Sequence, residues 1–126
     1  MSRPLFLIAA IPAFFGSFGH SYLGERDIFP KLSTAKTGLQ SQQLRIVRVT
    51  WHTASLTFAL LGFTLTLLGL KNGALTQAEE WIVMAIGAWY AVLGIACVAF
   101  WDKTKLQGWS FLGISGAILA GLRVTP

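Results

Sequence analysis

Charged residues are scarce in this chain of 126 residues, where Asp, Glu, Lys and Arg together make up only 12%. That share is about half of what soluble domains carry. Hydrophobic residues account for 54%, and 13 glycines add to the apolar share. A domain of this length leaves roughly a third of its surface exposed, so a water-soluble globule could not bury this excess. The composition therefore predicts a single transmembrane domain over residues 1–126.

Several kinds of chemistry lack their sequence signatures. The chain has one cysteine, Cys97, so an internal disulfide is excluded. It contains no glycine-rich phosphate loop, no pair of carboxylates inside an apolar segment and no evident Ser-His-acid spacing, the patterns from which hydrolysis or phosphate chemistry is inferred. We therefore expect a protein that is not an enzyme.

Four apolar segments contain no Asp, Glu, Lys or Arg: residues 4–24, 49–70, 81–101 and 106–122. Each is close to the ~20 helical residues that cross a hydrocarbon core of ~30 Å. The sequence thus predicts an all-α fold, an integral membrane four-helix bundle. Pro12 predicts a bend in the first span. Residues 41–48 contain no helix breaker and are expected to extend the second span, and residues 102–105 are expected to form a tight hairpin.

Basic residues are distributed unevenly between the two sides of these spans. Seven of the ten lie in the first and third connections: Arg26, Lys31, Lys36, Arg45, Arg48, Lys103 and Lys105. Because cytoplasmic loops of membrane proteins carry the excess of Lys and Arg, both connections are expected in the cytoplasm and both termini outside a bacterial inner membrane. This topology explains the net charge of +5 better than nucleic-acid binding does. The expected partners are the lipid bilayer and other membrane subunits.

Small residues recur at helical spacing in every span. Such residues let membrane helices approach closely, and we expect them at helix contacts. The candidates are Ala13, Gly16, Ser55, Ala59, Gly62, Gly87, Ala91, Gly94, Gly113 and Ala117.

Two histidines occupy matching depths in this arrangement. His20 lies near the end of the first span and His52 near the start of the second, so both fall in the cytoplasmic leaflet, about 9 and 11 Å from the midplane at 1.5 Å per residue. An ionisable side chain inside a span is a functional candidate, because exposing it to hydrocarbon is costly. In the structural alternative, each imidazole hydrogen-bonds a serine such as Ser17, Ser21 or Ser55 and joins the helices.

A cofactor role remains open for this pair. His20 and His52 could hold haem axially or bind a transition metal. For a metal, Cys97 and Glu25 are the further candidate ligands, although no Cys-x-x-Cys or His-x-x-x-His spacing is present. A proton-linked sensor or channel could instead combine the histidines with Glu25 at the mouth of the site.

Two short motifs resemble those of a known family. Residues 19–25, Gly-His-Ser-Tyr-Leu-Gly-Glu, and 48–55, Arg-Val-Thr-Trp-His-Thr-Ala-Ser, look like the signatures of an uncharacterised family of small four-helix bacterial membrane proteins. In that family a His-Ser-x-Leu-Gly-Glu box ends the first helix and a Trp-His pair opens the second. The resemblance implies a four-helix inner-membrane fold and draws attention to His20, Glu25, Trp51 and His52. We expect a structural or accessory role, within a larger membrane complex.

Overall fold

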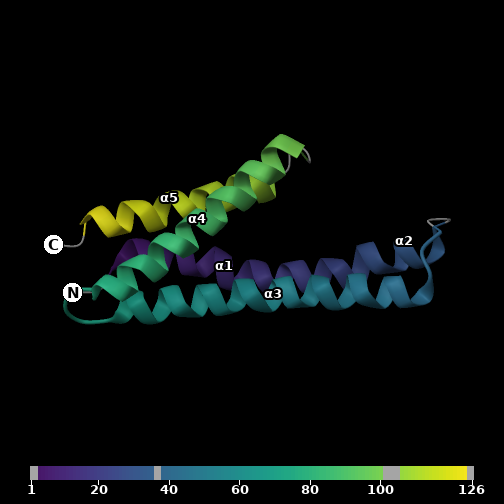
Figure 1. The fold of residues 1–126 in the computed structure, drawn as a ribbon, viewed down its shortest axis with the longest axis horizontal. Helices are drawn as coiled ribbons and strands as arrows, with labels where there is room; N and C mark the ends of the chain where they lie inside the picture. The colour runs from purple at the N-terminus through teal and green to yellow at the C-terminus, as the bar shows by residue number, and fades with distance from the viewer. Residues whose placement is uncertain (1–2, 36–37, 101–105, 125–126) are drawn as a thin grey trace.

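The computed structural model describes residues 3–35, 38–100 and 106–124 (Figure 1). Throughout these ranges the regular structure is helical, without strands. The helices are α1 (Pro4–Leu23), α2 (Phe29–Thr34), α3 (Ser41–Leu70), α4 (Gln77–Phe100) and α5 (Leu106–Val124), and a π-helical turn, η1 (Gly24–Ile28), joins α1 to α2. Because α1, η1 and α2 follow one another without a break, they form one helix of 31 residues.

Three of the helical segments are long and apolar enough to cross a membrane: the continuous α1–η1–α2 helix, α3 and α4. Large apolar side chains point away from the protein, among them Phe15, Leu56 and Trp81, each more than 60% exposed. Outward apolar side chains on such helices are stable in hydrocarbon. The predicted all-α fold is thus confirmed for the described residues, with three helices that are long and apolar enough to be membrane spans.

The helix boundaries differ from the sequence prediction at one place. As predicted, α3 begins at Ser41, well before the apolar segment. The first helix, however, continues to Thr34, so residues 25–34, which follow the predicted span 4–24, are helical. The predicted hairpin at 102–105, and residue 101 at the predicted end of the third span, lie outside the described residues.

Pro30 explains the π-helical turn. A proline inside a helix has no N–H to donate, and its ring clashes with the carbonyl group four residues earlier, here that of Arg26. Widening the preceding turn relieves this clash. The N–H of Phe29 accordingly donates to the carbonyl of Gly24, five residues back. The helix therefore passes through Pro30 with one π turn and continues.

The helices pack as two antiparallel pairs (Figure 1). α1 lies against α3, α4 lies against α5, and the pairs meet mainly through α1 and α5, while α3 and α4 contact each other little. The α4–α5 pair covers only part of the α1–α3 pair, which continues beyond it toward α2. The core lies where the pairs meet, and its most deeply buried side chains come from all four segments: Phe6, Leu65, Val83, Tyr90 and Ile118.

Close contacts between helices occur at several of the predicted small residues. A Cβ atom on Gly62 would lie 2.9 Å from the backbone nitrogen of Phe14, so α1 and α3 touch backbone to backbone there. Gly87 packs against Ile118, and Gly94 against Leu112.

The other predicted packing residues divide into two groups. Ala13 and Ser55 are buried, and three more are half-buried: Ala59, Ala91 and Ala117. Gly16 and Gly113 instead lie on outward faces, where no atom from residues 3–35, 38–100 or 106–124 is within 4 Å of an added Cβ. In this turn of α1 the buried residue is Ser17 and not Gly16, so the face of α1 that meets α3 lies one residue further along than predicted.

The two kinds of glycine predict opposite responses to the same change. Gly62→Ala places a methyl group against backbone that cannot move aside, and overpacking of this kind costs about 1–3 kcal/mol. Gly16→Ala meets open space and improves helix propensity, so the free energy of unfolding should stay unchanged or rise by up to about 1 kcal/mol. Reversible unfolding in mixed detergent micelles measures both. Equal effects at the two positions would contradict the described α1–α3 contact.

Candidate functional site

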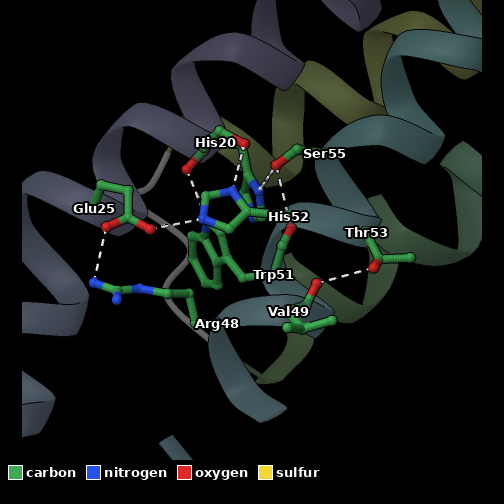
Figure 2. A network of polar contacts seen from close by, with 9 residues as sticks. His20, Glu25, Arg48, Val49, Trp51, His52, Thr53 and Ser55 are labelled. Carbon is green, nitrogen blue, oxygen red and sulfur yellow. Dashed lines mark hydrogen bonds and ion pairs between the residues drawn. The ribbon is translucent and has the colours of Figure 1, made fainter. Parts of the chain in front are cut away.

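The two histidines meet between α1 and α3, near the end of α1 and within the first half of α3 (Figure 2). His20 and Ser21 are consecutive on α1, whereas His52 and Ser55 are three residues apart on one face of α3. Because the helices run antiparallel, His20 contacts Ser55 and His52 contacts Ser21. Both imidazoles thus hydrogen-bond serines across the helix pair, as the structural alternative from sequence describes.

His20 is held as a hydrogen-bond donor. Its Nδ1 lies 2.8 Å from the Oγ of Ser55. The Ser55 hydroxyl has one hydrogen, which it donates to the carbonyl of Trp51 at 3.2 Å. Ser55 must therefore accept a hydrogen bond from the Nδ1–H of His20. In the neutral ring this leaves a lone pair on Nε2, which has no hydrogen-bond partner among the described residues.

Trp51 fixes the position of the His20 ring. The two rings stack with centroids 3.9 Å apart and planes 7° from parallel. The indole Nε1–H donates to the backbone carbonyl of His20 at 2.8 Å. Phe58 meets the same imidazole edge-on at 5.9 Å, from about two turns further along α3 than Trp51. The His20 side chain is therefore enclosed by aromatic rings of α3.

His52 has its hydrogen on the other ring nitrogen, Nε2, in contrast to His20. Its Nε2 lies 2.7 Å from Oε1 of Glu25, and its Nδ1 lies 2.9 Å from Oγ of Ser21. An ionised carboxylate only accepts hydrogen bonds, so Nε2 must carry a hydrogen. In the neutral ring Nδ1 then has the lone pair and accepts the hydroxyl hydrogen of Ser21. The two histidines consequently adopt different tautomers.

Glu25 connects this network to the protein surface. Its second oxygen, Oε2, accepts a hydrogen bond from Arg48 at 2.9 Å, and the two side chains are 45% and 52% exposed. The Arg48 guanidinium also lies over the ring of Phe29, 5.1 Å from its centroid. The site therefore extends from the buried Ser55 to an exposed ion pair, and one face of α3 holds both oxygens of Glu25, through Arg48 and His52.

The donor set fits a metal or haem poorly. Both ring nitrogens of His52 are hydrogen-bonded, so Nε2 of His20 is the one imidazole nitrogen of the pair without a protein partner in the described chain. No three His, Cys, Asp or Glu side chains in the described ranges are placed to share one metal ion. Cys97 lies on α4 at its contact with α5, where a Cβ on Gly108 would be 3.1 Å from that of Cys97. Of the two further candidate ligands, the structure places Glu25 beside His52, whereas Cys97 lies at the contact between α4 and α5.

Two residues have a larger part in the site than the sequence analysis gave them. From sequence, Ser21 is one of three serines that could hydrogen-bond an imidazole, and Arg48 is a basic residue of the first connection. Both stand four residues from a partner in the network, since Ser21 precedes Glu25 and Arg48 precedes His52 by four positions. This spacing places each pair on one helix face and was the available signal.

Comparisons with models of protein families, with curated proteins and with solved structures found no match.

The contact between Trp51 and His20 yields a direct test. Trp51→Phe keeps an aromatic ring but removes the N–H that reaches the His20 carbonyl, and we expect a loss of about 0.5–1.5 kcal/mol in the free energy of unfolding. Trp89→Phe is the matched control, because Trp89 is 49% exposed on α4. Its effect should stay within about 0.5 kcal/mol. Equal losses in the two variants would contradict the proposed bond.

Proposed function

We propose that this chain is a small multi-pass protein of the bacterial inner membrane with a structural or accessory role, as a subunit of a larger membrane complex. In this proposal α5 is the fourth span, the first and third connections face the cytoplasm, and both termini lie outside. The excess of basic residues in those connections supports this orientation. The two motifs that resemble those of small four-helix bacterial membrane proteins support the same assignment.

The observation that carries the subunit role is the outward placement of glycines on two helices. Gly16 and Gly19 on α1, and Gly113 and Gly116 on α5, have no atom of the described part of the chain within 4 Å of an added Cβ. Contact with lipid alone does not require glycine. Outward glycines do allow a helix of another subunit to approach closely, as small residues do in membrane helix contacts. The His–Ser network, by contrast, joins α1 to α3 within the chain.

The proposal predicts that enlarging an outward glycine disrupts association while the fold remains intact. Native mass measurement after mild detergent extraction should show this chain in a complex of defined stoichiometry. Gly16→Leu should release the free chain with an unchanged helical circular-dichroism spectrum, because no internal neighbour is displaced.

Phe15→Leu changes a neighbouring side chain that is 67% exposed and should retain the complex. A monodisperse chain without companions in the unsubstituted protein would contradict the subunit role.

A haem or metal role for His20 and His52 is the alternative that a spectrum decides. Since a single imidazole nitrogen of the pair lacks a protein partner among the described residues, we expect the purified protein to show no haem absorption and no stoichiometric transition metal on elemental analysis. A haem band that disappears in both His20→Ala and His52→Ala would favour the cofactor role over the structural one.

The proton-linked alternative rests on the chain of hydrogen bonds from Ser21 through His52 to the exposed Glu25. It requires proton flux across liposomes that contain the protein. His52→Gln would abolish this flux if the alternative holds.

A further inference from the structure

The hydroxyl of Ser21 differs from other hydroxyls in these helices. Serines within a helix commonly donate to a carbonyl of the preceding turn. Ser17 does so to Phe14 at 2.6 Å, and Ser110 does so to Leu106 at 2.9 Å. The Ser21 hydroxyl is instead turned across to Nδ1 of His52, 2.9 Å away. Its hydrogen is therefore held by a base and not by the helix backbone.

The direction of hydrogen bonding along this chain is fixed by its acidic end. Glu25 is held by Arg48 through one oxygen and accepts the Nε2–H of His52 through the other. Its carboxylate thereby orients the imidazole and fixes the hydrogen on Nε2. A hydroxyl, a neutral imidazole and a carboxylate in this order, at 2.9 and 2.7 Å, form the arrangement by which a weak serine nucleophile is activated.

The surroundings of Ser21 indicate a class of substrate. Ser21 is half-buried at the end of an apolar helix, and the side chains beside it, Tyr22 and Leu23, are 60% and 45% exposed. On the polar side, His52 and Glu25 are 38% and 45% exposed. The hydroxyl thus lies where an apolar surface meets a polar one. A molecule with a fatty-acyl chain and a polar headgroup fits this boundary.

We propose that Ser21 is the nucleophile of an acyl-transfer reaction on a lipid ester at the membrane surface, a function beyond the subunit role. Oγ of Ser21 attacks the ester carbonyl carbon, and its proton passes to Nδ1 of His52. The ester C–O bond then breaks, and the leaving alcohol takes that proton from His52, leaving an acyl group on Ser21. Water, or a second alcohol, attacks this acyl group with the same proton transfer through His52, which restores the Ser21 hydroxyl.

The test is covalent labelling of the purified full-length chain in phospholipid nanodiscs. The probe is an alkyl fluorophosphonate, which reacts with activated serine hydroxyls. Intact-mass analysis should show one adduct, and peptide mapping should place it on Ser21. His52→Gln should slow labelling by at least about 100-fold, the lower range for loss of a general base. Ser110→Ala should label at the unsubstituted rate, because Ser110 bonds its own helix backbone.

Ser21→Ala should abolish the adduct, and a second variant keeps the test decisive if Ser21→Ala fails to fold. Ser21→Cys retains a nucleophile beside His52, and iodoacetamide should alkylate Cys introduced at this position at least tenfold faster than Cys97 in the same chain. Adding His52→Gln should remove that difference.

Either of two results would overturn the proposal. One is the absence of a Ser21 adduct under conditions that fully label an authentic serine hydrolase. The other is labelling whose rate does not depend on His52. Because labelling uses the isolated chain, its failure would leave the subunit role intact, and failure to form a complex would not alter the labelling.

Discussion

The close approach of α1 to α3 is the constraint on which the rest of the structure depends. It is set at Gly69, where an added Cβ would meet Leu7 at 2.7 Å, and at Gly62, where it would meet the backbone of Phe14. From Leu7 to Phe14 the contact advances seven residues along α1, and from Gly69 to Gly62 it goes back seven residues along α3. The same register, continued for about two turns, brings His20 to Ser55 and Ser21 to His52. The contacts at Gly62 and Gly69 therefore set the register of α1 against α3, and this register determines which polar side chains of the two helices lie opposite each other.

The sequence was sufficient for those features that depend on hydrophobicity, on the absence of helix breakers and on depth within a span. The apolar segments, the helical extension that begins at Ser41 and the meeting of the two histidines could all be predicted. The continuation of the first helix through Pro30 could not, because a proline is compatible with both a helix end and a π turn. Neither could the outward positions of Gly16 and Gly113 be predicted, since small residues have the same spacing whether they face another helix of the chain or a neighbouring molecule.

The difference between the two histidines arises from their tertiary contacts and not from the local sequence. By residue type and depth they look equivalent, which is why a shared metal or haem was a reasonable hypothesis. Their partners make them different: Ser55 has already donated its hydrogen to the backbone and can only accept from His20, whereas the carboxylate of Glu25 forces the opposite tautomer on His52. These partners lie more than twenty residues away in the chain. No local motif could have assigned them.

A purely structural network and an activated serine share most of their contacts, and Ser21 is where they differ. A polar group inside a membrane protein costs several kcal/mol if left unpaired, so joining helices requires only that each group has a partner. Ser21 could meet that requirement through its own helix backbone, as Ser17 does one turn earlier. Its hydroxyl instead completes a chain in which an arginine holds a carboxylate and the carboxylate orients an imidazole. Pairing the Ser21 hydroxyl requires only one hydrogen-bond partner. Here the imidazole that accepts its hydrogen is itself oriented by a carboxylate, and the carboxylate is held by an arginine. This additional orientation is what a nucleophile needs and a helix contact does not.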